Sequence, residues 1–335
     1  MIRRLAIGCT VLFFYSLPCF AFEKLTSAEH FLGTRIDVTV CYEAGTKQQA
    51  VSAVDAVWAR FSVAHAHMNL FDPLSDLSKI RRAAGETVQV QDDVYALIET
   101  SKKYKAVSGG VFDVTIGSLS DLWTRASLRN AIPSSDEIRQ ARGQVDAGRI
   151  ELLGNGRVRV PSDMVIDLGG DAAGYLADKS AGILRQAGFM NFLVNAGGEI
   201  YAGGRSCQGR PWRVGINKPQ GGGRISGVVE LQDAAVSTSG SYERYWTIKG
   251  QHWSHIINPV TGYPAQDVIS ATVIAPTALE ADIFSTALSV LGPLVGNRLI
   301  ERMGPGYAAM ITAGAQDGQL LEYSTAGYSK FKSIR

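Results

Sequence analysis

The chain has 335 residues, enough to bury a large core as one big domain or as two closely packed lobes. Its composition is ordinary for a globular protein, and its formal net charge of +2 gives no electrostatic reason to expect a nucleic-acid partner. The sequence has no GxGxxG motif opening a βαβ unit, no P-loop and no paired CxxC, which excludes the common nucleotide-binding and zinc motifs.

The N-terminus is typical of a secretory signal peptide. A basic start precedes the apolar run 5–17, and Cys19 and Ala21 put small side chains at the two positions that a cleavage site requires. The run is short for a membrane-spanning helix, and no later segment of the sequence is long and apolar enough to be one. Pro18 beside Cys19 argues against a lipoprotein signal. We predict a signal peptide over 1–21 and a soluble periplasmic protein without a lipid anchor.

Two cysteines, Cys41 and Cys207, remain after that cleavage. An oxidising compartment permits a disulfide between them, but a long separation in sequence says little about their distance in space. No histidine or other cysteine lies at ligand spacing from either, so they do not resemble metal ligands. We expect two free thiols.

Hydrophobic periodicity predicts interleaved helices and strands. In chain order they are a strand at 35–42, a helix at 48–67, a helix from about 92 to 107, a hairpin at 149–161, a helix at 171–187, a strand at 191–196, several strands between 211 and 275, helices at 277–291 and 294–303, and a strand pair near 307–312 and 319–323. There is no internal repeat and no clean linker. We therefore predict a single α+β domain with much antiparallel sheet over 22–335.

The segment 166–204 combines glycine turns with acidic side chains. Asp167 enters the turn at Gly169 and Gly170, and an apolar strand later runs into Gly197, Gly198 and Glu199. Glycine lets the backbone approach a ligand closely, and carboxylates offer it hard oxygens. A helix and a strand joined by tight turns would explain the glycines alone, so this segment by itself favours a structural role.

A possible metal site lies on the helix predicted at 277–291. Asp282, Ser285 and Thr286 stand at positions i, i+3 and i+4, so they share one face. A carboxylate and two hydroxyls are hard oxygen donors that suit Mg²⁺. Taken alone, such a group is more often an ordinary polar face of a helix.

Five separated motifs together resemble the ApbE family of FAD:protein FMN transferases, which move FMN from FAD onto a threonine or serine of another protein. They are FLGT (31–34), SGGVFDVTIGSLSDLW (108–123), the glycine-rich segment 166–204, SGSYERYWTIKGQHWSHIINPVTGYP (239–264) and ALEADIFSTALSVLG (278–292). The resemblance covers nearly all of the mature chain. It implies a T-fold-related α+β domain with antiparallel sheets and packed helices.

The resemblance also implies roles for individual residues. The implied Mg²⁺ ligands are Asp282, Ser285, Thr286 and a backbone oxygen of Gly170. The implied flavin contacts are Leu32, Phe71, Val111, Phe112, Asp113, Asp167 and Ile256, with Ala173 in the phosphate-binding turn. The implied catalytic residues are Asp282, Thr286 and His255. Because a lone histidine beside isoleucines is usually a structural group, we place His255 next to the ligand without assigning it proton transfer.

One departure from the family pattern concerns the expected diphosphate site. Ala173 stands where the family usually has lysine, and Asp171 adds an acidic side chain to the same turn. The turn is thus two charge units more negative where an anion should bind. Unless Lys179, Arg205 or Arg244 supplies a replacement positive charge, the affinity for FAD should fall or depend more on Mg²⁺.

The resemblance implies FAD as substrate, Mg²⁺ as cofactor and a separate acceptor protein, such as a flavoprotein subunit of a membrane electron-transfer complex. The family's acceptor motif resembles Asp-Gly-x-Thr-Gly-Ala-Thr, and this chain has no such motif. Two alternatives remain open. One is an FAD-binding homologue without transfer, acting as a flavin carrier or FAD pyrophosphatase. The other is a non-enzymatic periplasmic binding or assembly protein.

Overall fold

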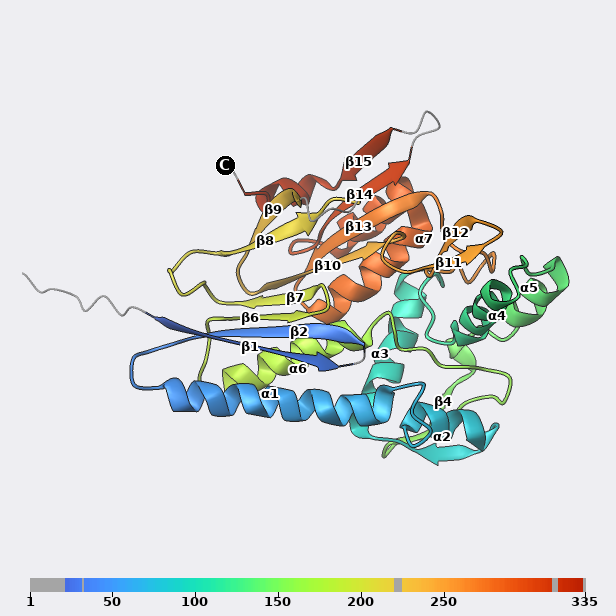
Figure 1. Cartoon of the computed structure of the whole chain (residues 1–335), viewed down its shortest axis with the longest axis horizontal. Coiled ribbons are helices and arrows are strands. Elements are labelled where there is room, and N and C mark those ends of the chain that lie inside the picture. Colours follow the sequence, from blue (N-terminus) through green and yellow to red (C-terminus); the bar gives the residue numbers. More distant parts are fainter. Residues whose placement is uncertain (1–21, 32, 220–224, 315–318, 334–335) are drawn as a thin grey trace, which may run out of the picture.

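The structure is a computed structural model that describes residues 22–31, 33–219, 225–314 and 319–333 (Figure 1). The predicted signal peptide at 1–21 and the predicted flavin contact Leu32 lie outside these described residues.

An eight-stranded sheet forms the centre of the molecule (Figure 1), with the order β1-β2-β6-β7-β10-β13-β14-β15. These strands are β1 Glu23–Phe31, β2 Thr34–Tyr42, β6 Phe192–Ala196, β7 Glu199–Gly203, β10 Ala234–Gly240, β13 Val268–Ala275, β14 Ala308–Gly314 and β15 Leu320–Ser324. Every neighbouring pair is antiparallel. Strand β2 shows the expected alternation, because Ile36, Val38 and Val40 are buried while the residues between them are less so. The predicted α+β class with antiparallel sheet is confirmed.

Three helices pack on one face of this sheet: α1 Lys47–Met68, α6 Ala172–Gln186 and α7 Ala278–Met303. Helix α3 Asp92–Val107 packs against α1 and contributes to the same core. Helix α6 packs between α1 and α7 (Figure 1). The apolar face predicted for the first helix is the one it buries, through Val54, Val57 and Phe61. All four helices begin and end within a few residues of the predicted positions.

Helix α7 is broken at Gly292, where φ is 73°, and Pro293 follows. The break separates the two helices predicted at 277–291 and 294–303, since proline cannot continue the hydrogen-bond ladder. Among the described residues, α7 is the one helix that is long and apolar enough to cross a membrane by length and composition, so the expectation that no later segment meets this criterion is wrong. Half of its most apolar stretch is buried, and it packs against β10, β13 and α6.

A hairpin of β8 Trp212–Asn217 and β9 Ile225–Leu231 belongs to a second core with residues of β2, β7, β10, β13 and β14. Cys41 on β2 and Cys207, in the segment leading to this hairpin, form a disulfide with a Cα–Cα distance of 5.2 Å. The expectation of two free thiols is therefore wrong. The fold brings together two residues that are 166 positions apart, which spacing in sequence does not reveal.

A smaller lobe is built from α4 Gly117–Leu128, α5 Ser135–Arg142 and the hairpin of β11 Tyr245–Ile248 and β12 Gln251–Ser254 (Figure 1). Its centre is Trp123, whose ring lies 5.0 Å from that of Trp253 and 6.4 Å from that of Trp246. The Trp123 indole donates a hydrogen bond to the Gly262 carbonyl at 2.9 Å. This lobe fixes the segment 255–262 beside the end of the main sheet.

The remaining elements are α2 Asp76–Ala83, two short 3-10 helices at Ala147–Arg149 and Ala326–Lys330, and a small sheet of β3 Thr87–Gln89, β4 Glu151–Leu152 and β5 Arg157–Arg159. The last two strands lie within the hairpin predicted at 149–161.

Candidate active site

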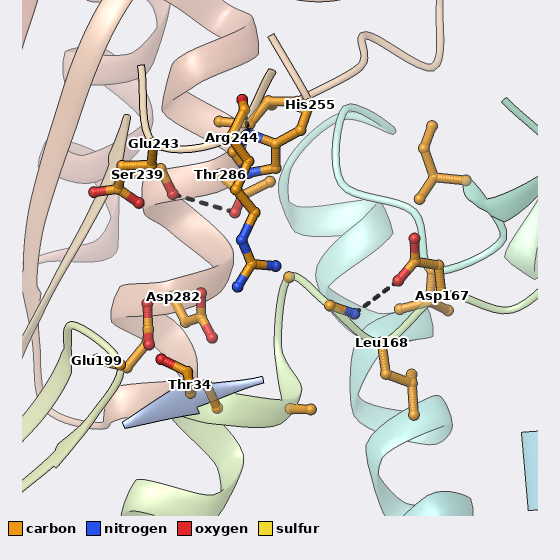
Figure 2. Close-up of a pocket in the computed structure, with 18 of the residues that line it drawn as sticks. Thr34, Asp167, Leu168, Glu199, Ser239, Glu243, Arg244, His255, Asp282 and Thr286 are labelled. Atoms are coloured by element: carbon orange, nitrogen blue, oxygen red, sulfur yellow. Dashed lines mark hydrogen bonds between the residues drawn. The ribbon is translucent and has the colours of Figure 1, made fainter. Parts of the chain in front are cut away.

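A cavity of about 410 Å³ lies between the end of the main sheet, helices α6 and α7, and the smaller lobe (Figure 2). Its volume is in the range of small-molecule and cofactor sites. The predicted site residues that line it are Val111, Phe112, Asp113, Asp167, Gly170, Ala173, His255, Ile256, Asp282 and Thr286. These residues come from four motifs that are far apart in the sequence.

Two predicted site residues do not line the cavity. Phe71 is 92% exposed, in the loop between α1 and α2. Ser285 is fully buried, and its hydroxyl forms hydrogen bonds with Ser237 at 3.2 Å and Ser239 at 2.8 Å. Ser239 in turn lies 3.4 Å from the Thr286 hydroxyl (Figure 2), so Ser285 contacts the cavity wall through a neighbour.

Asp282 is held at the crossing of α6 and α7. Its Oδ2 accepts a hydrogen bond at 3.0 Å from the backbone N–H of Gly174, in the first turn of α6. A Cβ at Gly174 would lie 2.5 Å from the Ala278 carbonyl and 2.8 Å from the Asp282 Cβ. Only glycine allows the two helices to approach so closely, and the positive end of the α6 dipole then faces the carboxylate.

A second carboxylate, Glu199, lies beside Asp282 (Figure 2). Burial raises the pKa of Glu199 to about 7. Burial, together with the charge of Glu199, raises the pKa of Asp282 well above its usual range. Two buried acidic groups without a cation oppose each other's ionisation, and a bound cation would relieve both effects.

The residues around Asp282 fit a hard divalent cation. Thr286 is one turn along α7, and the ideal Cβ position of Gly170 is 3.7 Å from the Thr286 hydroxyl. In the described part of the chain, no three His, Cys, Asp or Glu side chains lie close enough to hold a metal. A cation here would therefore take a carboxylate, a hydroxyl and a backbone carbonyl, a mixture that Mg²⁺ accepts and Zn²⁺ rarely does.

Two other acidic side chains of the cavity are used to shape its wall. Asp167 closes its own turn, because Oδ1 accepts the Gly169 N–H at 2.9 Å (Figure 2). Asp113 is buried and accepts hydrogen bonds from the backbone N–H and hydroxyl of Thr115, at 2.9 Å and 2.6 Å. Lys105 lies 3.0 Å from Asp113. The Asp113 charge is thus compensated within the protein, and the carboxylate ties its own segment to Thr115 and Lys105.

Asp171 does not add the negative charge that the sequence suggested. It is completely buried, and burial raises its pKa well above the usual range. Its Oδ2 is hydrogen-bonded to the Ser101 hydroxyl, which also bonds to the Leu97 carbonyl at 2.7 Å. The one hydroxyl hydrogen of Ser101 cannot serve both acceptors, so both bonds are satisfied when Asp171 carries a proton. The expected difference of two charge units is thereby reduced to one, the missing lysine.

Of the three proposed replacement cations, Arg244 alone lines the cavity. Lys179 lies over the Tyr175 ring, 4.9 Å from its centroid. Arg205 donates a hydrogen bond to the Gly209 carbonyl at 3.1 Å. Figure 2 shows the Arg244 guanidinium extending into the cavity between Asp282 and Asp167.

His255 has a defined tautomer. Its Nδ1 is 2.8 Å from the backbone carbonyl of Arg244, and because a carbonyl only accepts, Nδ1 carries the hydrogen. Burial lowers the pKa of His255, so the ring is neutral near pH 7. Its Nε2 then has a free lone pair and can take a proton.

Several cavity residues were not among the predicted site residues, and the polar ones include Glu199, Ser239 and Glu243. Glu199 had a local signal, since it directly follows the Gly197-Gly198 turn. Ser239 and Glu243 lie in the motif at 239–264. Nothing in their spacing distinguishes this serine and this exposed glutamate from ordinary surface residues.

The fold and the cavity together define an α+β protein whose described residues enclose a site of the size that binds small molecules and cofactors. The chain belongs to the ApbE family, whose model matches residues 32–311.

Similar proteins agree with this assignment. An FAD:protein FMN transferase from Escherichia coli K12 is 34% identical over 223 residues, which is 64% of this chain and 64% of that protein. One from Treponema pallidum is 33% identical over 288 residues, covering 81% of this chain and 79% of the relative. The solved flavinyl transferase ApbE from Pseudomonas stutzeri has a TM-score of 0.82 and 28% identity, covering 95% of this chain and 100% of that structure. The chain spans 64% of the length of the first of these relatives.

Proposed function

We propose that this protein is an exported FAD:protein FMN transferase that attaches FMN from FAD to a threonine or serine of a partner flavoprotein. The observation that carries the proposal is the cavity in which Asp282, Thr286 and Gly170 lie together with His255. Membership of the ApbE family and the names of its relatives support the same reaction.

The reaction requires a nucleophile from outside this chain. The acceptor hydroxyl oxygen attacks the FMN phosphorus of FAD, a new P–O bond forms, and the diphosphate P–O bond breaks to release AMP. The hydroxyl proton passes to Nε2 of His255, whose Nδ1 is held by the Arg244 carbonyl. The reaction needs no enzyme nucleophile, and the chain's residues position the two reactants and stabilise charge.

Asp282, Thr286 and the Gly170 carbonyl would hold Mg²⁺, with Ser285 orienting the hydroxyls behind them. Bound Mg²⁺ would neutralise the charge that develops on the phosphate oxygens. The raised pKa values of Asp282 and Glu199 support this assignment, because burial without a cation disfavours their charged forms.

Export to the periplasm is supported by two observations. The sequence predicts a signal peptide, and the Cys41–Cys207 disulfide is a bond that persists in oxidising compartments. The acceptor would then be a protein exposed in the same compartment, such as a flavoprotein subunit of an electron-transfer complex.

A second candidate is a flavin carrier or an FAD pyrophosphatase without transfer, and Ala173 in place of the family lysine favours it. Release of AMP from FAD separates the candidates when it is measured with and without an acceptor domain. A transferase releases AMP only when acceptor and Mg²⁺ are both present. A pyrophosphatase releases it without acceptor, and a carrier or assembly protein releases none.

A further inference from the structure

The cavity has an uneven distribution of charge. Its acidic lining residues are Asp113, Asp167, Glu199, Glu243 and Asp282. Among the described residues that line it, Arg244 is the one side chain with a permanent positive charge, since His255 is neutral near pH 7. An anionic ligand in this cavity therefore depends on Arg244, apart from any bound metal.

The Arg244 guanidinium is not committed to another group of the protein. Within the described part of the chain it makes no hydrogen bond or ion pair, and no acidic oxygen lies within 4.0 Å of it. Glu199 and Glu243 are still near enough for its charge to lower their pKa against the larger, opposite effect of burial. Among the described residues, these acidic neighbours act on the Arg244 charge at a distance and do not pair with it directly.

The backbone at Arg244 is held firmly. Its carbonyl accepts hydrogen bonds from the His255 backbone N–H at 3.2 Å and from His255 Nδ1 at 2.8 Å. The same residue thus orients the histidine with its carbonyl and presents a guanidinium to the cavity (Figure 2). A planar guanidinium can bind two oxygens of one anionic group at once, and the diphosphate is the part of FAD that offers such oxygens together with negative charge.

We propose that Arg244 binds the diphosphate of FAD and supplies the positive charge that position 173 lacks. This inference rests on the proposed function and adds a positioning residue to it. Arg244 would hold the diphosphate between the proposed cation ligands around Asp282 and the His255 ring. In that position the FMN phosphorus faces the incoming hydroxyl.

The test compares the binding of FAD and riboflavin, which lacks phosphate, by flavin fluorescence in a chelator-containing buffer at several salt concentrations. Arg244→Ala should weaken FAD binding about 10- to 100-fold, the loss typical of a charged hydrogen-bonding group, and leave riboflavin binding unchanged. The salt dependence of FAD binding should fall in the same variant. Arg244→Lys should be intermediate, because it keeps the charge and loses the planar fork. Lys179→Ala, which removes a cation outside the cavity, is the matched control and should bind FAD as the unaltered protein does.

Two results would overturn the inference: unchanged FAD affinity in Arg244→Ala, or an equal loss of FAD and riboflavin, which indicates a change in cavity shape. Thermal unfolding checks that Arg244→Ala is folded, and Arg244→Lys carries the comparison if it is not. Failure of the unaltered protein to bind FAD would instead contradict the proposed function itself. FAD binding and transfer that survive in Arg244→Ala would leave the function standing without this residue.

Discussion

Individual residues decide the chemistry because few of them carry uncompensated charge. Asp113 and Asp171 are acidic in sequence, but one is paired with Lys105 and the other is satisfied as a neutral acid. Asp282 is then available to bind a cation, and Arg244 is available to bind an anion. This distinction depends on burial and hydrogen bonding, which is why the sequence overstated the negative charge of the turn.

The metal assignment predicts the behaviour of Asp282→Asn. Loss of the carboxylate should reduce Mg²⁺-dependent AMP release about 100-fold or more, as removal of one strong electrostatic contact does in other enzymes. The fold should persist, because a neutral side chain at this buried position avoids the cost of a desolvated charge. Ser289→Ala, further along α7 and outside the cavity, serves as the control in the same assay. Retained Mg²⁺ dependence in Asp282→Asn would place the metal elsewhere.

At the scale of elements, the crossing of α6 and α7 positions the site. Gly174→Ala should destabilise the protein by about 1 to 3 kcal/mol, because the added methyl group would overlap the Ala278 carbonyl. It should also reduce activity, since the helices must separate and Asp282 loses its backbone donor.

Gly182→Ala is the matched control on the same helix, where an added Cβ meets no atom within 4 Å. It should be neutral or stabilising by about 0.5 to 1 kcal/mol, because alanine favours helices. Chemical denaturation of both variants measures the difference. Equal stability of the two would show that the helices tolerate a wider crossing.

The disulfide provides a second test at this scale. Reduction, or the double change of Cys41 and Cys207 to serine, should lower stability by about 2 to 4 kcal/mol. Neither cysteine lines the cavity, so the affinity for FAD should remain. Thermal unfolding with and without a thiol reductant checks this, and the double variant should not respond to the reductant. An unchanged melting temperature on reduction of the unaltered protein would indicate that the bond does not form in solution.

The elements differ in how well the sequence predicts them. Helix α3 and the break at Gly292 carry strong local signals and were predicted within a residue or two. Strand β1 was missed because it is an edge strand, mostly exposed and without a clear apolar face. Helix α5 was also missed, although Ser134 and Glu137 form a capping box that the sequence already displays. The disulfide and the pairing of Asp171 with Ser101 join distant segments, so no local pattern could predict them.

At the scale of the whole molecule, the cavity forms only when segments from most of the described chain come together. The cavity takes Thr34 from β2, Phe61 from α1, Glu199 from β7 and Asp282 from α7, so nearly the full length of the described chain contributes to it. Such an arrangement concentrates buried acidic groups at one place. Their ionisation should therefore be visible in the stability of the whole domain.

We expect the stability of the metal-free protein to fall as pH rises from 5 to 7. Burial raises the pKa of Asp178 to about 6 and the pKa of Glu199 to about 7. It also raises the pKa values of Asp171 and Asp282 well above their usual range. In this window the folded state keeps protons that the unfolded chain releases, so each step up in pH favours unfolding.

Other groups act differently in the same window. His255, whose pKa burial lowers, opposes the trend, because the unfolded chain binds the proton that the folded state does not. The hydrogen bond from Arg129 lowers the pKa of Glu137 to about 2. Glu137 is therefore ionised in both states above pH 5, and its contribution to stability is constant between pH 5 and 7. Melting temperatures between pH 5 and 7 in a chelator measure the net effect, and Mg²⁺ should reduce the slope. A melting temperature that rises steadily over this range would contradict the predicted ionisation of these groups.

The most direct measurement is the intact mass of an acceptor domain that carries a threonine in a motif like Asp-Gly-x-Thr-Gly-Ala-Thr. The domain would be incubated with this protein, FAD and Mg²⁺, beside a sample with chelator and one with Asp282→Asn. We expect the mass of the acceptor to increase by one FMN, and we expect no increase in either comparison sample. An acceptor of unchanged mass, with FAD intact or split to FMN and AMP, would contradict the transferase function.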